Sequence, residues 1–153
     1  MSKIEIGNEA PNFNLMTDGN GQINLSELKG KNVVIFFYPK DNTPGCTQEA
    51  KDFKENIGAF KNKNVVIIGI SKDSVNSHDK FKSKYELPFT LASDEELQAC
   101  NDYGVWVEKS MYGRKYMGIE RSTFLISPEG KIQNIWRKVK VKGHADEVLE
   151  AIE

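Results

Sequence analysis

Short runs of β-branched and aromatic residues alternate along the chain with segments whose apolar residues recur at helical spacing. The two clearest runs, residues 33–38 and 65–70, are typical of strands that are buried on both faces of a sheet. Between them, residues 44–62 predict a helix, because one stripe of apolar residues runs along this segment. The stripe consists of Ala50, Phe53, Ile57 and Phe60. A strand, a helix and a second strand in this order predict a right-handed parallel crossover.

The rest of the chain continues the alternation of strands and helices. Asp18-Gly19-Asn20-Gly21 is a strong turn signal that predicts a small hairpin within residues 1–30, and Ser26 can cap a helical turn that ends at Gly30. The later predicted elements are a helix from Asp73 or Ser74 to before Pro88, a strand at 89–91, a helix from Asp94 to about Tyr103, a loop or irregular hairpin at 105–117, a hairpin of strands 123–126 and 132–136, and a final helix with Ala145, Val148, Leu149 and Ile152 on one face.

This order of elements predicts an α/β fold with a central mixed β-sheet, a mostly parallel core and helices on both faces. A length of 153 residues fits a single domain, residues 1–153, that can bury a sizeable core. The sequence contains no internal repeat, linker or low-complexity segment.

Composition excludes several classes of protein. The formal net charge of -1 gives no reason to expect nucleic acid or an anionic membrane as a partner. The first residues lack the apolar stretch of a secretory signal, and the longest apolar runs are too short to span a bilayer as helices. Two cysteines far apart in sequence do not make a disulfide scaffold, so we expect a reducing, cytoplasmic location.

The candidate chemistry lies between the first predicted strand and the helix that follows it. Pro44 suits the first position of a helix, Thr43 is a plausible N-cap, and Cys46 therefore falls in the first helical turn. The exposed N–H groups and the partial positive charge of a first turn favour a thiolate, which is the form that reacts with peroxides and disulfides. The alternative, a small buried hydrophobic cysteine, ranks second because the flanking residues are polar or turn-forming.

Three segments of the sequence resemble the peroxiredoxins, specifically their bacterioferritin comigratory protein (Q-type) branch. They are Thr43-Pro44-Gly45-Cys46-Thr47 with Pro39 upstream, Tyr103-Gly104-Val105-Trp106, and the segment from Tyr116 to Ile126. The resemblance covers nearly the whole chain. It implies a thioredoxin-like fold and a thiol-dependent peroxidase that reduces hydrogen peroxide and organic hydroperoxides through a thiolate and sulfenic acid cycle. It implies no cofactor and no metal.

Peroxide reduction requires a thiolate, groups that orient the peroxide, and stabilisation of charge on the departing oxygen. Cys46 supplies the thiolate and becomes sulfenic acid. The Thr43 hydroxyl is close enough in sequence to donate to the thiolate or to the peroxide, which is compatible with capping. The backbone N–H groups of Gly45 and Cys46 can hold the other oxygen. Pro39 either shields the thiolate from water or simply ends the strand.

A cation beside the sulfur would favour the thiolate and stabilise the transition state. The chain has three arginines, and the resemblance identifies Arg121, just before Thr123-Phe124-Leu125-Ile126, as the one in the site. Arg114 and Arg137 are expected to be surface charges.

The sequence leaves the route back to the thiol open. Many Q-type relatives carry a second cysteine five residues after the first, where this chain has Lys51. Cys100 lies at helical spacing from Leu97 and Tyr103, which favours a core thiol. Alternatively, Cys100 resolves the sulfenic acid after local unwinding, or an external thiol attacks Cys46 directly. The resemblance implies thioredoxin, glutaredoxin or a low-molecular-weight thiol as reductant, and a monomer more readily than a dimer.

The two histidines predict neither an acyl-transfer site nor a zinc site. His78 shares a helical side with Val75, Phe81 and Tyr85, which is typical of a partly buried packing residue, and His144 is expected to face solvent. Two other functions stay open. A thioredoxin-like disulfide exchanger is disfavoured because Thr43 stands where a Cys-x-x-Cys pair has its first thiol, and a redox sensor would oxidise stoichiometrically without recycling.

Overall fold

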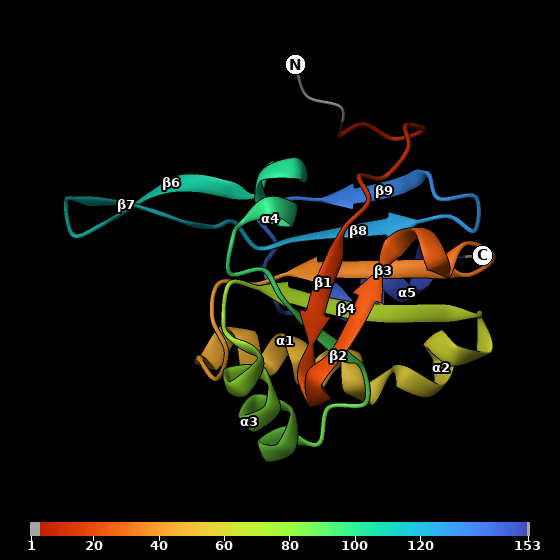
Figure 1. Cartoon of the computed structure of the whole chain (residues 1–153), viewed down its shortest axis with the longest axis horizontal. Coiled ribbons are helices and arrows are strands. Elements are labelled where there is room, and N and C mark those ends of the chain that lie inside the picture. The colour runs from red at the N-terminus through yellow and green to blue at the C-terminus, as the bar shows by residue number, and fades with distance from the viewer. Residues whose placement is uncertain (1–3, 153) are drawn as a thin grey trace.

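The computed structural model describes residues 4–152, which fold around one seven-stranded sheet and a separate two-stranded hairpin (Figure 1). The strands are β1 (Asn14–Thr17), β2 (Gly21–Asn24), β3 (Asn32–Phe37), β4 (Val65–Ser71), β5 (Thr90–Ser93), β6 (Trp106–Met111), β7 (Arg114–Ile119), β8 (Ser122–Ile126) and β9 (Ile132–Trp136). The helices are η1 (Asp18–Asn20), η2 (Leu25–Leu28), α1 (Pro44–Glu55), α2 (Ile57–Asn62), α3 (Val75–Tyr85), α4 (Gln98–Asp102) and α5 (His144–Glu150), of which η1 and η2 are 3₁₀.

The strand order in the large sheet is β2-β1-β5-β4-β3-β8-β9. Strands β3, β4 and β5 are parallel to one another, whereas β1 pairs antiparallel with β5, β8 pairs antiparallel with β3, and β9 pairs antiparallel with β8. The predicted mixed sheet is therefore confirmed. The predicted parallel core is confirmed at β3, β4 and β5, and the N-terminal and C-terminal hairpins add antiparallel pairings on both sides of it.

Alternate residues of the central strand pack into two different cores. Val33, Ile35 and Phe37 of β3 belong to a cluster that also holds Cys100 and Tyr103. Val34 and Phe36, on the other face, belong to a cluster built with α1, α2, α3 and α5. Because successive side chains of a strand point to opposite faces, the sheet separates these two clusters. Strand β3 is apolar throughout since both of its faces are covered.

The predicted helix over residues 44–62 is two helices in the structure. Its regular turns stop at Asn56, whose backbone leaves helical geometry with ψ near 8°. The Asn56 side chain donates to the carbonyl oxygen of Asp52 and to the carboxylate of Asp146. An asparagine that bonds locally and to a neighbouring helix competes with the helix ladder, and the chain changes direction there.

Two further segments differ from prediction. Residues 106–119 form a regular antiparallel hairpin, β6 and β7, that extends away from the sheet (Figure 1). The helix expected from Asp94 begins only at Gln98, because Leu97 takes a left-handed φ of 64° and Asp94 instead accepts the N–H groups of Ala99 and Cys100. No helix among the described residues is long and apolar enough to cross a bilayer.

Candidate functional site

Cys46 lies in the first turn of α1, at the end of the loop that leaves strand β3. Pro44 is the first residue of this helix and Thr43 takes extended N-cap geometry, as the sequence predicts. The Thr43 hydroxyl does not cap the helix, however: it donates to the carbonyl oxygen of Lys40 at 3.0 Å. That part of the prediction is wrong, because the Thr43 hydroxyl oxygen accepts no hydrogen bond from a backbone N–H of the first turn.

The guanidinium of Arg121 contacts the Cys46 sulfur, although the two residues are 75 positions apart. Arg121 Nη2 donates to Cys46 Sγ at 3.4 Å, and Arg121 Nη1 donates to Glu49 Oε1 at 2.7 Å. Glu49 and Cys46 lie on the same side of α1, one turn apart, and both residues are 1% exposed. One planar cation therefore bridges a sulfur and a carboxylate in a site that is largely closed to water.

Charge and burial oppose each other in this group. Burial raises the pKa of Glu49 to about 7, although the Arg121 cation acts in the other direction. Burial lowers the pKa of Arg121, but the Glu49 carboxylate and the Cys46 sulfur outweigh it, and the net direction is upward. Arg121 consequently stays charged beside the sulfur. Among the described residues, the second oxygen of Glu49 is the one buried side-chain polar atom that has no hydrogen-bond partner.

Gly45 leaves room for the guanidinium. Gly45 is exposed, and a Cβ atom built on it would lie 3.2 Å from Arg121 Nη2. Gly45 and Cys46 occupy the second and third positions of α1, where backbone N–H groups have no acceptor within the helix. The first turn can therefore bind an oxygen atom from the same side as the sulfur.

A second cation comes from the projecting hairpin. Burial and the charge of Arg121 lower the pKa of Lys109 on β6, and the Cys46 sulfur opposes them, so Lys109 lies within electrostatic range of both. The sequence analysis missed Lys109 and Glu49. Glu49 leaves a signal in the sequence, because a carboxylate one turn after Cys46 interrupts an otherwise apolar stripe. Lys109 leaves no such signal in the sequence, since its position relative to Cys46 depends on how the hairpin of β6 and β7 is oriented in the fold.

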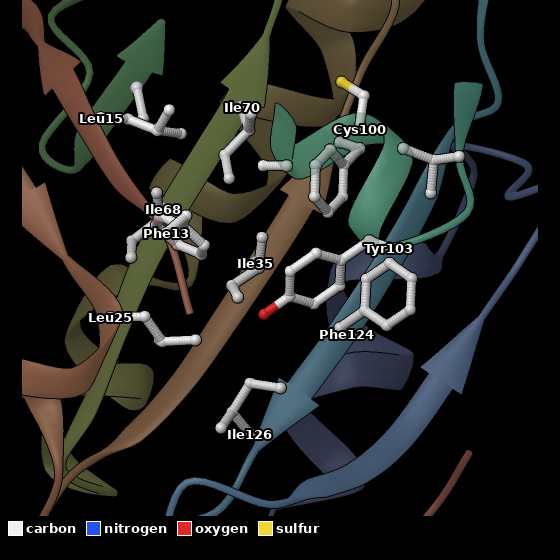
Figure 2. Close-up of a cluster of buried hydrophobic side chains, with 14 of the residues drawn as sticks. Phe13, Leu15, Leu25, Ile35, Ile68, Ile70, Cys100, Tyr103, Phe124 and Ile126 are labelled. Atoms are coloured by element: carbon white, nitrogen blue, oxygen red, sulfur yellow. The ribbon is translucent and has the colours of Figure 1, made fainter. Parts of the chain in front are cut away.

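Cys100 lies on the opposite face of the sheet from Cys46. It is fully buried in the cluster that includes Tyr103 and Phe124, shown in Figure 2, whereas Cys46 belongs to the cluster on the other face. Burial, and to a lesser extent Asp94, raises the pKa of the Cys100 thiol far above its ordinary value. Its predicted place in the core is confirmed. A disulfide exchanger would require two adjacent sulfurs, and these two are not adjacent.

The other residues named from the sequence lie near the end of β3 or on the surface. Pro39 is half-buried at the end of β3, and Lys51 is exposed on α1. Arg114 is exposed, as expected. Arg137 is also exposed, but its guanidinium donates to the carbonyl oxygens of Tyr103 and Gly104 and lies over the Phe124 ring.

Both histidines are more deeply buried than the sequence predicts. His144, expected to face solvent, is 4% exposed, and its Nε2 lies 2.7 Å from the hydroxyl of Thr123. That prediction is wrong because α5 packs its first turn, rather than only its later apolar face, against α1 and β8. His78 is completely buried, with hydrogen-bond partners on both ring nitrogens.

The chain is similar along most of its length to proteins of one family. A family model described as AhpC/TSA matches residues 6–135, which include both Cys46 and Arg121. A putative peroxiredoxin Bcp of Coxiella burnetii is 53% identical over 146 residues, covering 95% of this chain and 97% of the relative. The peroxiredoxin Bcp of Bacillus subtilis is 50% identical over 149 residues, covering 97% of this chain and 95% of the relative.

Solved structures agree with these relatives. The bacterioferritin comigratory protein of Xanthomonas campestris, whose structures address alkyl peroxide reduction, superposes with a TM-score of 0.88 at 48% identity, covering 92% of this chain and 89% of that one. A PrxQ mutant of Xylella fastidiosa gives a TM-score of 0.92 at 42% identity, covering 98% and 96%.

Proposed function

The chain belongs to the AhpC/TSA family and is a thiol-dependent peroxidase of the peroxiredoxin class with a thioredoxin-like fold, and from this premise we propose that Cys46 is its peroxide-reducing nucleophile. The observation that carries the proposal is the 3.4 Å contact between Arg121 Nη2 and Cys46 Sγ in the first turn of α1. A fixed cation and a helix N-terminus together favour a thiolate at this sulfur.

The reaction is a displacement at oxygen. The Cys46 thiolate attacks the terminal oxygen of the hydroperoxide, an S–O bond forms, the O–O bond breaks, and the alkoxide or hydroxide takes up a proton and leaves. Negative charge moves from sulfur to the leaving oxygen. Arg121 and the N–H groups of Gly45 and Cys46 stabilise that charge because they are already in place before the reaction.

Glu49 and Thr43 orient the other participants. The 2.7 Å bond from Arg121 Nη1 to Glu49 leaves Nη2 directed at the sulfur. The Thr43 hydroxyl donates a hydrogen bond to the backbone carbonyl oxygen of Lys40, so its oxygen lone pairs can accept a hydrogen bond from the peroxide. Pro39 shields the thiolate from water at the end of β3.

An external thiol restores Cys46 in a one-cysteine cycle. The sheet between Cys46 and Cys100 and the complete burial of Cys100 argue against internal resolution. A first thiol attacks the sulfenic acid to give a mixed disulfide and water, and a second releases the Cys46 thiol as the external disulfide leaves. The reductant is thioredoxin, glutaredoxin or a low-molecular-weight thiol, the enzyme acts as a monomer, and the required supply of thiol suits the cytoplasm.

The substrates are hydrogen peroxide and organic hydroperoxides. The Xanthomonas relative, studied for alkyl peroxide reduction, supports the second class. The proposal is tested by comparing Cys46→Ser with Cys100→Ser, each assayed for peroxide consumption with thiol present and analysed by intact mass after one equivalent of peroxide. We expect Cys46→Ser to be inactive but folded, and Cys100→Ser to turn over and to carry one added oxygen on Cys46. Turnover by Cys46→Ser would refute the assignment.

A further inference from the structure

A buried polar network lies beneath the loop that leads to Cys46. The Asp41 carboxylate accepts the Tyr38 hydroxyl at 2.6 Å and the Ser77 hydroxyl at 2.8 Å, and it lies 2.7 Å from His78 Nδ1. Asp41 is 7% exposed and His78 is not exposed at all. Buried polar groups of this kind are retained only when their hydrogen bonds are satisfied, and here they are.

The pair of Asp41 and His78 holds one more proton than a neutral imidazole and a carboxylate. His78 Nε2 lies 3.0 Å from the carbonyl oxygen of Ala92, which can only accept, so this nitrogen carries hydrogen. The other nitrogen faces the Asp41 carboxylate, so a second proton lies between them. This hydrogen bond, 2.7 Å long and buried at both ends, links α3 to the loop before Cys46.

Helix α3 holds the turn before Cys46 through contacts with two consecutive residues of that turn, Asp41 and Asn42. Ser77 and His78 bind the Asp41 side chain, and the Tyr85 hydroxyl donates to the side chain of Asn42 at 3.1 Å. Asn42 has a φ of 61°, a left-handed conformation that asparagine adopts more readily than other non-glycine residues and that suits a tight turn. These contacts fix the turn immediately before the N-cap of α1.

The same cluster has the composition of a metal site but not its bonding. One ligand atom each from Asp41, Asp73 and His78 lie within 4.8 Å of one another. Yet Asp73 Oδ2 already accepts the Asp41 backbone N–H and the Ser71 hydroxyl, at 2.8 and 2.6 Å. The groups are satisfied by the protein itself, which points to a structural link between the loop and its surroundings.

We propose that Asp41 and His78 are positioning residues for peroxide reduction, because their buried bridge to α3 sets where Cys46 lies relative to Arg121. The proposal rests on the proposed role of Cys46. The backbone of Arg121 is fixed on its own side, because it directly precedes β8, which pairs with β3, and its carbonyl oxygen accepts the Val139 N–H at 3.0 Å. The alignment of sulfur and guanidinium therefore depends on where the loop places the start of α1. A displacement of about 1 Å at a reacting group can cost up to roughly a hundredfold in rate.

The test compares Asp41→Ala with Asp41→Asn and with Asp18→Ala. The rate constant for oxidation by hydrogen peroxide is measured in single turnover, together with the pH dependence of Cys46 alkylation, at a temperature where circular dichroism shows each variant folded. Asp41→Ala is expected to react about tenfold or more slowly. It should also shift alkylation to higher pH. Asp41→Asn should restore most of the rate, since an amide can donate to a neutral His78 while keeping the same shape.

Asp18→Ala is the matched control for loss of stability. Asp18 also holds α3, through an ion pair with Lys82 at 2.7 Å, and it accepts the N–H of Leu91 in β5, but none of these bonds reaches the loop before Cys46. Equal rate losses in Asp18→Ala and Asp41→Ala would overturn the proposal, as would an unchanged rate in Asp41→Ala. Failure of the proposed role of Cys46 is recognised separately, because Cys46→Ser would then still consume peroxide.

A milder variant and a direct measurement keep the test decisive if Asp41→Ala does not fold. Ser77→Ala removes one bond to the same carboxylate and should slow oxidation in the same direction. In the wild-type protein, nitrogen-detected NMR of His78 should show that both ring nitrogens are hydrogen-bonded. An unaltered rate in Ser77→Ala, or one unprotonated and unbonded ring nitrogen, would contradict the bridge.

Discussion

Gly45 and Arg121 are so close that a Cβ atom on Gly45 would lie 3.2 Å from Nη2 of the guanidinium. We therefore expect Gly45→Ala to displace Arg121 from Cys46 by a few tenths of an ångström and to slow peroxide reduction several-fold. Stability should not fall, because Gly45 lies in a helix where alanine is favoured by about 1 kcal/mol.

Gly58→Ala provides the control for this substitution. Gly58 lies in α2, and nothing lies within 4 Å of the Cβ atom that it lacks. It should raise the free energy of unfolding without changing the rate of peroxide reduction. Equal rates in Gly45→Ala and Gly58→Ala would show that the guanidinium tolerates the added methyl group.

Arg121→Ala should remove the cation that contacts the Cys46 sulfur. We expect peroxide reduction to slow by about a hundredfold, the scale for losing one charge-stabilising donor. Alkylation of Cys46 should also move to higher pH. Arg114→Ala, which removes an exposed arginine on β7, should leave both measurements unaltered. An unchanged pH profile in Arg121→Ala would exclude Arg121 from the mechanism.

Glu49 predicts a specific dependence of stability on pH. Burial raises its pKa from an ordinary 4.5 to about 7, so the folded state keeps a proton that the unfolded chain has lost. The stabilisation of the folded state by this proton is fully present below about pH 4.5 and is lost as the pH rises through about 7. The two pKa values differ by the equivalent of roughly 3 kcal/mol, as an upper limit.

Chemical denaturation across this pH range, compared between wild type and Glu49→Gln, isolates the Glu49 contribution. His144 acts in the opposite sense, since burial lowers its pKa, but it is common to both proteins and cancels in the comparison. The difference in unfolding free energy between the two proteins should change with pH. Parallel curves would mean that folding does not raise the pKa of Glu49.

Cys100→Ala should separate stability from turnover. Deleting a sulfur atom from a fully buried position in the cluster of Figure 2 should lower the free energy of unfolding by about 1–2 kcal/mol. Thiol-dependent turnover should persist at the wild-type rate. Loss of turnover in folded Cys100→Ala, with a disulfide between Cys46 and Cys100 in oxidised wild type, would instead establish internal resolution.

The sequence predicts the centre of the fold better than its edges. Strand β3 and strand β4 lie within one residue of their predicted limits, since an apolar run buried on both faces can be little else. The break at Asn56 depends on a contact with Asp146, 90 residues away, and no local pattern contains it. The regular pairing of β6 with β7 likewise comes from cross-strand register in a segment with weak periodicity.

The candidate site could likewise be predicted only in part from local sequence. Cys46 and Thr43 follow from local signals, because a proline and a strand end place them at a helix start. The proximity of Arg121 required the resemblance, and the structure reports its 3.4 Å contact with Cys46. The burial of His144 could not be predicted, since its helix alone has an apolar face elsewhere and the contact with Thr123 arises only on packing.

The β-sheet between Cys46 and Cys100 also bears on how long one molecule stays active. In the proposed one-cysteine cycle, a sulfenic acid on Cys46 waits for a thiol from solution. If a second peroxide arrives first, it forms sulfinic acid, which ordinary thiols do not reduce. The balance of thiol and peroxide around the protein thus decides how many cycles each copy completes before it is permanently inactivated.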